Sequence, residues 1–168
     1  MKVEKRMNVL SIFKGTLAPH TLEAAIVISA FLHQGVKDKG GRPYICHPLW
    51  IYGELVKKCA TMEVLIVALL HDVVEDTSLT LSELESWFSP TICSAIDAIS
   101  KRPDEDSETY LRRVAMDTIA RQVKKEDLRH NMDITRLKNR AKLTQKDLDR
   151  IADYAMKYDF LVGGLHNV

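Results

Sequence analysis

An imidazole and three carboxyl groups follow a strongly apolar stretch in the segment Leu69–Thr77, LLHDVVEDT. Burying such groups costs several kcal/mol unless something compensates for their charge and lost hydration, and a divalent cation does so most simply. We therefore interpret the polar residues of this segment as candidates for metal binding and acid–base chemistry. They are His71, Asp72, Glu75 and Asp76. The alternative is a capped helix end whose acidic side chains face water.

The spacing of these residues places them along one side of a helix. With about 3.6 residues per turn, His71 lies one turn from Glu75, and Asp72 lies one turn from Asp76 in the same way. Adjacent residues diverge by about 100° around the helix, so His71 and Asp72 could share one ion only if it sits off the helix axis. Other segments must therefore supply the remaining ligands.

Two further segments offer polar residues whose direction the chain restricts. His47 lies on the proline-bounded approach to a helix, next to Pro48. Asp127 and Asn131 are four residues apart and therefore share a helix face. His47 could instead cap its helix or hydrogen-bond a carbonyl, and the Asp127 segment could be a solvated charged face. His130 points about 60° from Asp127 around that helix, so we do not expect it to be a ligand.

Taken together, four of these residues form a nitrogen and oxygen ligand set without sulfur. They are His47, His71, Asp72 and Asp127. Two imidazoles and two carboxylates suit one ion of manganese, iron or zinc. Such an ion can lower the pKa of a bound water from about 15.7 toward neutrality and neutralise a phosphate oxygen. Glu75 and Asp76 could then orient or deprotonate that water.

Residues 36–43, VKDKGGRP, are charged, glycine-bearing and proline-ended, which is typical of a loop. The cations of this loop are Lys37, Lys39 and Arg42. Because glycine lets a backbone approach phosphate closely, we expect these side chains to meet an anionic substrate.

The elements that would position these residues are helices. Hydrophobic periodicity and capping residues predict helices over residues 21–35, 48–56, 64–74, 80–88, 89–100, 107–121, 123–137 and 144–162. The sequence has no alternating strand pattern, internal repeat or domain linker. We therefore predict an all-α fold, a compact bundle of about seven helices in a single domain over residues 1–168, with residues 1–18 as a partly disordered leader.

Composition and charge exclude several classes of protein. The chain has 168 residues, of which 46% are apolar and 28% charged, as in a globular protein with a core. Its net charge of +1 has no basic half or tail, so nucleic acid is not an expected partner. Three cysteines without CxxC spacing argue against a thiolate zinc site and a disulfide framework.

Membrane and secretory signals are also missing from the sequence. The longest apolar stretches fall short of the roughly 20 residues that a bilayer requires, and no signal-peptide core follows the charged N-terminus. We therefore expect a cytoplasmic protein without a membrane partner. The sequence leaves the oligomeric state open.

Three ordered motifs resemble the HD-domain metal-dependent phosphohydrolases, and more narrowly the hydrolase domain of the RelA/SpoT alarmone enzymes and their small single-domain relatives. The motifs are His33 followed by residues 41–48 (GRPYICHP), residues 69–77 (LLHDVVEDT) and residues 127–132 (DLRHNM). The resemblance covers most of the chain and implies an all-helical fold with a metal, usually manganese, held by the four ligands named above. It also implies that Glu75 and Asp76 activate water, in a reaction that removes the 3'-pyrophosphate from guanosine tetra- or pentaphosphate.

The resemblance also implies a set of substrate contacts. Lys39 resembles the lysine that meets substrate phosphate, Asn131 a nucleotide-site residue, and Tyr154 a tyrosine near the ribose and phosphates. Tyr44 belongs to the first motif and is assigned to the same pocket. His33 matches a family position and could contact phosphate or support the site, although a hydrogen-bonded core histidine is an equal alternative.

One position departs from the family pattern. Alarmone hydrolases often carry two consecutive arginines before that lysine, whereas this chain has Lys37-Asp38. Because an anion at a phosphate-binding lip reverses the local attraction, Asp38 favours an alternative substrate, a less charged nucleotide or a sugar phosphate. Arg42 could restore a charge from the other side of the loop. A third hypothesis is a pocket that binds a nucleotide without turnover, but the presence of Glu75 and Asp76 favours the two hydrolase hypotheses.

Overall fold

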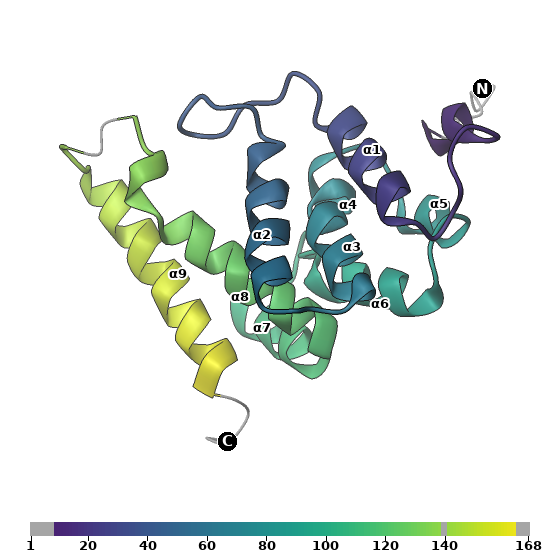
Figure 1. The fold of residues 1–168 in the computed structure, drawn as a ribbon. Coiled ribbons are helices and arrows are strands. Elements are labelled where there is room, and N and C mark those ends of the chain that lie inside the picture. Colours follow the sequence, from purple (N-terminus) through teal and green to yellow (C-terminus); the bar gives the residue numbers. More distant parts are fainter. Residues whose placement is uncertain (1–8, 139–140, 164–168) are drawn as a thin grey trace, which may run out of the picture.

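The computed structural model describes residues 9–138 and 141–163, and every regular element within them is helical (Figure 1). The helices follow in the order η1 (Val9–Phe13), α1 (Leu22–Leu32), α2 (Cys46–Lys57), α3 (Met62–Leu70), α4 (Val73–Asp76), α5 (Leu81–Glu85), α6 (Pro90–Ile99), α7 (Ser107–Met116), α8 (Thr118–Met132), η2 (Ile134–Arg136) and α9 (Gln145–Gly163). The predicted all-α fold is therefore confirmed.

Helix α3 lies at the centre of the molecule. Every residue from Val64 to Leu70 is buried, and helices α1, α2, α6 and α8 pack around it. This burial explains why the segment is apolar on all sides and not only along one stripe. Because α3 contacts both α2 and α8, its C-terminal end brings His71 close to the candidate ligands on those two helices.

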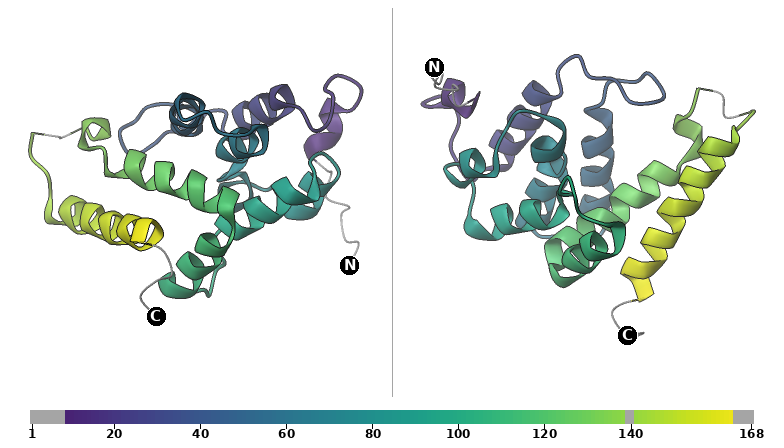
Figure 2. Two further views of the ribbon diagram at one scale, coloured as in Figure 1. Left: turned by 60° about the horizontal axis from the view of Figure 1, so that its bottom comes forward. Right: turned by 180° about the vertical axis from the view of Figure 1, so that it is seen from behind.

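Helix α9 lies outside this core, along α8 and against α7 (Figures 1 and 2). Leu161 is its one residue described as buried. The side of α9 that carries Arg150, Tyr154 and Lys157 lines a pocket. The long helix therefore forms a wall of the pocket and contributes little to the core.

The predicted helix over residues 64–74 is broken in the structure. Helix α3 ends at Leu70, a turn at His71 and Asp72 follows, and the short α4 begins at Val73. His71 Nδ1 lies 2.9 Å from the Ala68 carbonyl oxygen and uses an acceptor near the end of the helix. Such a side-chain contact competes with the backbone ladder, which gives a physical reason for the break. The break also makes the number of helices higher than predicted.

The predicted boundary between the helices over residues 107–121 and 123–137 is wrong. Helix α7 ends at Met116, because Asp117 is extended and accepts hydrogen bonds from the backbone N–H groups of Ile119 and Ala120. Helix α8 therefore starts earlier than predicted. It also ends earlier, at Met132, where Asp133 caps the separate helix η2.

The starts of α5 and α6 follow their predicted signals, whereas α1 ends at Leu32 and α5 at Glu85, earlier than predicted. Thr80 and Glu83 form the expected capping box of α5, and Ser89 caps α6 ahead of Pro90. Part of the predicted leader, residues 1–8, lies outside the described residues, and the rest includes η1 with the buried Leu10. None of the helices in the described part of the chain has the length and apolar character needed to cross a bilayer.

Candidate active site

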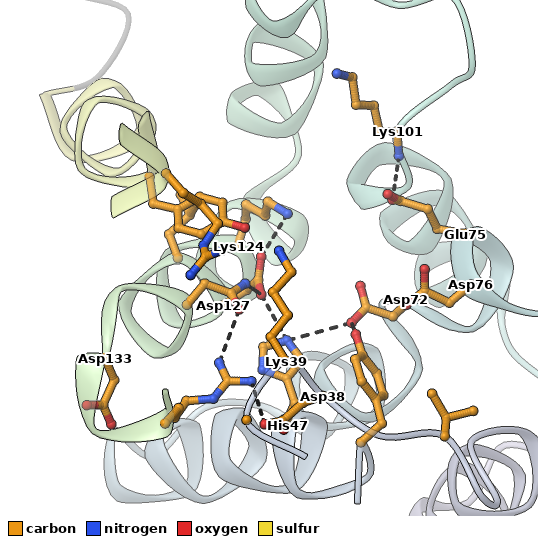
Figure 3. Close-up of a pocket in the computed structure, with 18 of the residues that line it drawn as sticks. Asp38, Lys39, His47, Asp72, Glu75, Asp76, Lys101, Lys124, Asp127 and Asp133 are labelled. Atoms are coloured by element: carbon orange, nitrogen blue, oxygen red, sulfur yellow. Dashed lines mark hydrogen bonds and ion pairs between the residues drawn. The ribbon is translucent and has the colours of Figure 1, made fainter. Parts of the chain in front are cut away.

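A pocket of about 690 Å³ opens between the loop after α1, helix α4, helix α8 and helix α9 (Figure 3). Most of the predicted site residues line it. They are His33, Lys37, Lys39, Tyr44, His47, Asp72, Glu75, Asp76, Asp127, Asn131 and Tyr154. His71 lies beneath them, only 1% exposed. Arg42 is not among the lining residues that the structure describes, so its predicted contact with substrate finds no support here.

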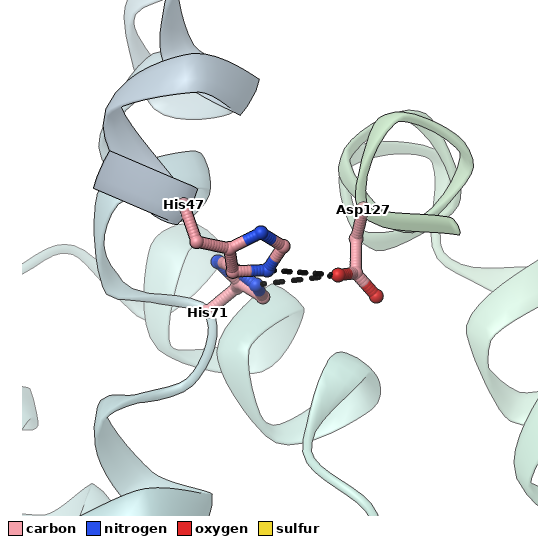
Figure 4. Close-up of side chains that lie close together, drawn as sticks. All are labelled: His47, His71 and Asp127. Atoms are coloured by element: carbon pink, nitrogen blue, oxygen red, sulfur yellow. Dashed lines mark ion pairs between the residues drawn. The ribbon is translucent and has the colours of Figure 1, made fainter. Parts of the chain in front are cut away.

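Three of the predicted ligands converge at the floor of this pocket (Figure 4). His47 comes from the first turn of α2, His71 from the end of α3 and Asp127 from α8. All three are buried, and their ligand atoms lie within 4.8 Å of one another. Asp127 Oδ1 is 3.0 Å from His47 Nε2 and 3.9 Å from His71 Nε2. This group, His47–His71–Asp127, is hereafter called the metal-site group.

Asp72, the fourth predicted ligand, lies beside the metal-site group. Its Oδ2 is 2.9 Å from His71 Nε2 and 3.6 Å from His47 Nε2. The same oxygen accepts a hydrogen bond from the Tyr44 hydroxyl. Asp72 therefore presents its carboxylate to both imidazoles from the α4 side.

The donor set fits a divalent cation. If the neutral His71 ring donates from Nδ1 to the Ala68 carbonyl, its Nε2 carries a lone pair. This Nε2 is buried and has no aligned hydrogen-bond partner among the described residues, although the oxygens of Asp72 and Asp127 face it. Lone pairs on nitrogen and oxygen that converge in this way repel each other unless a cation or a proton lies between them.

The electrostatic field at the floor is strongly negative. Burial alone would lower the pKa of His71, but the charges of Asp72 and Asp127 outweigh it and raise this pKa to about 9. Burial would likewise raise the pKa of Asp72, yet the neighbouring His71 lowers it to about 2. A field that holds a proton on a buried imidazole also attracts a metal cation to the same place.

A partly buried lysine balances part of this charge. Lys124 Nζ is 2.7 Å from Asp127 Oδ2, so the second oxygen of Asp127 remains for the metal-site group. Burial opposes the charged forms of both groups, but their pairing dominates: the pKa of Asp127 falls well below its usual range and that of Lys124 rises. Lys124 was not predicted as a site residue, although it lies three residues before Asp127 on one helix, a spacing at which side chains interact.

The two candidate proton-handling residues lie on α4, next to Asp72. Asp76 continues the helical ladder through its N–H to the Asp72 carbonyl. Burial and then the charge of Asp72 raise the pKa of Asp76. Glu75 Oε2 accepts a hydrogen bond from the backbone N–H of Lys101 at 3.0 Å (Figure 3). Both carboxyl groups line the pocket.

His47 has a second partner that we did not expect. Its Nδ1 lies 2.6 Å from His130 Nδ1, and the two rings lie edge to edge in nearly parallel planes, with centroids 4.9 Å apart. Trp50 stacks on the His130 ring, with centroids 4.3 Å apart. Burial, and then the charge of Arg136, lowers the pKa of His130 to about 3. His130 is not in the metal-site group, but it is in contact with it.

His33 is buried at the edge of the same pocket. Its Nδ1 is 3.0 Å from the Ser29 carbonyl oxygen, and its ring lies 4.8 Å from that of Tyr44. Its Nε2 has no hydrogen-bond partner among the described residues. Burial lowers the pKa of His33 and favours the neutral ring. His33 therefore combines the two alternatives, because it is a hydrogen-bonded buried histidine and also lines the pocket.

The loop over residues 36–43 is held against the segment after α8. Asp38 Oδ1 accepts from the Arg42 backbone N–H at 2.9 Å, and Asp38 Oδ2 lies 3.4 Å from Arg136 Nη2. A Cβ on Gly40 would lie 2.1 Å from the Arg136 carbonyl oxygen, so only glycine fits this close approach. Arg136 also donates to Asn131 Oδ1, and Asn131 Nδ2 donates to Asp127 Oδ1. Polar contacts thus connect the loop to the metal-site group.

The part of the pocket above the metal-site group, hereafter called the upper part, carries several cations. Besides Lys37 and Lys39, the lining includes Lys101, Arg136, Arg150 and Lys157, which the sequence analysis did not select. Burial, followed by the charges of Arg150 and Lys146, lowers the pKa of Lys39. Crowded positive charge of this kind is relieved by an anion, so this part of the pocket suits phosphate groups.

Comparisons with known proteins find relatives by sequence and by fold. No family model matches the chain. Over 151 residues the chain is 30% identical to a GTP pyrophosphokinase of Myxococcus xanthus, covering 80% of this chain and 20% of that protein. It is 34% identical over 80 residues to the bifunctional (p)ppGpp synthase/hydrolase SpoT of Escherichia coli, covering 48% of this chain and 11% of SpoT. The chain thus spans a fifth or less of the length of these relatives.

The fold has a match that covers most of both molecules. The solved structure of a metazoan orthologue of SpoT, reported to hydrolyse ppGpp and to play a role in starvation responses, superposes with a TM-score of 0.70. The match covers 87% of this chain and 88% of that one, at 27% sequence identity.

Proposed function

We propose that this chain, which belongs to the SpoT/RelA type of HD hydrolase domain, removes the 3'-pyrophosphate from guanosine 3',5'-polyphosphates with one divalent metal ion. The observation that carries the proposal is the buried metal-site group at the floor of a pocket whose upper part is cationic. The comparisons support the choice of substrate, since a structurally similar protein and a sequence relative both act on ppGpp.

The metal-site group together with Asp72 would hold the ion, through two imidazole nitrogens and two carboxylates. Manganese suits this nitrogen and oxygen set, and iron or zinc would also fit it. When bound, the ion lowers the pKa of a coordinated water and neutralises charge on a phosphate oxygen. Lys124 keeps Asp127 ionised, and the Tyr44 hydroxyl orients Asp72.

The residues of α4 would handle the proton. Because burial and Asp72 raise the pKa of Asp76, this carboxylate accepts a proton more readily than an exposed aspartate does. One oxygen of Glu75 is fixed by the Lys101 backbone, so the other can orient the attacking water. Glu75 would thus position the water, and Asp76 would accept its proton.

The cations in the upper part of the pocket would bind the phosphates. Lys39 lies in a region crowded with positive charge, and Arg150 and Tyr154 line the opposite wall on α9. Asn131 donates a hydrogen bond to Asp127, and Tyr44 donates one to Asp72. Both side chains would therefore lie between the reacting phosphate at the floor and the nucleoside. Lys37 would add charge at the entrance.

Asp38 is compatible with this substrate. Its carboxylate pairs with Arg136 and accepts from a backbone N–H, so much of its charge is balanced inside the protein. The same pair, however, leaves Arg136 with less positive charge to offer a substrate. For this reason Asp38 still favours the second candidate function, an HD-type phosphatase acting on a less charged nucleotide or a sugar phosphate.

A product analysis tests the proposal. Protein loaded with Mn²⁺ is incubated with guanosine tetraphosphate, guanosine pentaphosphate, mononucleotides and sugar phosphates, and every product is identified by mass. Release of pyrophosphate together with guanosine 5'-diphosphate from the tetraphosphate, or guanosine 5'-triphosphate from the pentaphosphate, supports the proposed reaction. Orthophosphate release from mononucleotides or sugar phosphates would favour the phosphatase. Nucleotide binding without any product would leave a non-catalytic binding module.

A further inference from the structure

The Nδ1 edge of the His47 imidazole faces a group that the proposed reaction does not use. His130, on α8, meets this edge through its own Nδ1, and Trp50, one turn further along α2, stacks on the His130 ring. His130 is 5% exposed and lies three residues after Asp127. The same two helices therefore provide two members of the metal-site group and the rings that pack beside them.

The contact between the two imidazoles requires one proton between two nitrogens. The Nδ1 atoms are 2.6 Å apart, so one donates and the other accepts. If His47 binds a metal through Nε2, its proton lies on Nδ1 and His130 Nδ1 must accept it. His130 then carries its own proton on Nε2.

The opposite arrangement suits the protein without metal. His47 Nε2 is 3.0 Å from Asp127 Oδ1, a contact that needs a proton on Nε2. His47 Nδ1 then has a lone pair, and His130 Nδ1 must donate to it. A carboxylate or carbonyl at the place of His130 could only accept, whereas an imidazole can take either role.

We propose that His130 is a positioning residue that holds the His47 ring and exchanges its donor and acceptor roles when the metal binds. The inference rests on the proposed metal-dependent function. Each ring keeps one proton throughout: that of His47 moves from Nε2 to Nδ1, and that of His130 moves from Nδ1 to Nε2. His47 therefore retains a hydrogen-bonded Nδ1 in both states, which avoids an unpaired buried nitrogen.

Two substitutions separate the hydrogen bond from the stacking. His130→Phe keeps a flat ring stacked on Trp50 but removes both nitrogens. His130→Gln keeps an amide that can donate or accept. Loss of a partner that orients a metal-binding histidine weakens affinity by about 10- to 100-fold. We expect this loss for His130→Phe in equilibrium dialysis against Mn²⁺ or Zn²⁺, and partial recovery for His130→Gln.

A control and a spectroscopic measurement exclude a purely structural role. Trp50→Phe keeps a ring against His130 and leaves both imidazoles intact, so its metal affinity should stay close to that of the unmodified protein. Nitrogen-15 NMR of labelled histidines, with and without Zn²⁺, reports which ring nitrogen carries the proton. The expected result is an exchange of tautomers at His47 and His130 on metal binding, a readout that does not depend on the folding of any variant.

Unchanged affinity in His130→Phe, or the same His130 tautomer in both states, would overturn this inference alone. If the unmodified protein binds neither ion, the proposed function fails and the inference fails with it.

Discussion

The floor and the upper part of the pocket differ in how their residues are held. His47, His71 and Asp127 come from three helices packed around the core, and none of them is more than 3% exposed. Lys39 and Asp38 belong to a loop that is held by a glycine contact and by one ion pair with Arg136. We infer that core packing determines the chemistry at the floor, whereas charges near the surface determine which substrate binds.

The largest effect is expected from His71→Ala at the floor. The variant removes Nε2, which faces Asp72 and Asp127, together with the Nδ1 contact to the Ala68 carbonyl oxygen. Turnover of guanosine tetraphosphate should fall by about 1,000-fold or more, since several kcal/mol of electrostatic stabilisation are lost. Calorimetric titration with Mn²⁺ should show that binding is lost in parallel. Normal Mn²⁺ binding in this variant would show that His71 does not hold the metal, and would contradict the inference that the floor determines the chemistry.

Lys124→Met tests how much the ion pair with Asp127 contributes to the free energy of unfolding. Lys124 forms an ion pair with the buried Asp127, and their side chains are 17% and 5% exposed. Removing one partner of such a pair costs about 3 kcal/mol, so the free energy of unfolding of the metal-free protein should fall by that amount. Saturating Mn²⁺ should restore part of it, because the ion also compensates Asp127.

Urea denaturation with and without Mn²⁺ measures both effects of Lys124→Met. Lys125→Met is the matched control, since Lys125 is the next residue and does not line the described pocket. It should unfold nearly as the unmodified protein does. Equal loss of stability in both variants would show that the Lys124–Asp127 pair has no special role.

Glu75→Gln tests whether α4 contributes to the chemistry without holding the metal. The amide oxygen can still accept from the Lys101 backbone, so the local structure should persist. Turnover should fall by about 100-fold if Glu75 handles the water, while Mn²⁺ affinity stays close to normal. Steady-state kinetics combined with metal titration measures both quantities. Unchanged turnover would remove Glu75 from the mechanism.

The smallest effects are expected in the upper part of the pocket. Asp38→Asn weakens the pair with Arg136 and removes a negative charge from the loop. The KM for guanosine tetraphosphate should fall by about threefold, with little change in kcat and a steeper dependence on salt. Arg42→Ala is the control from the same loop, because Arg42 does not line the described pocket. A KM that rises in Asp38→Asn would instead mean that the ion pair supports the substrate site.

The floor could be predicted from the sequence because its signals are local. The segment Leu69–Thr77 combines an apolar run with a histidine and acids, and the structure brings His47 and Asp127 to it. Two residues that contact the floor, Lys124 and His130, were not predicted. Lys124 lies three residues before Asp127 on α8, a spacing that the sequence does contain. Whether His130 reaches His47 depends instead on how α2 crosses α8. One sequence does not specify that crossing.

The upper part of the pocket was harder to predict for a related reason. Arg136 and Arg150 look like ordinary charged residues of exposed helices, and only the packing of η2 and α9 brings them to the pocket. Arg42, which looks equivalent to Lys39 in the loop, does not reach it. The break at Asp117 was missed because the apolar spacing continues through it, although an aspartate before Thr118 is a typical cap.

The position of the metal itself tests the central claim most directly. Crystals grown with Mn²⁺ and measured at the manganese absorption edge should show a single anomalous peak per chain. We predict that this peak lies within bonding distance of His47 Nε2, His71 Nε2 and Asp127 Oδ1, with Asp72 as the fourth ligand. A peak elsewhere in the pocket, or no peak at saturating Mn²⁺, would contradict it.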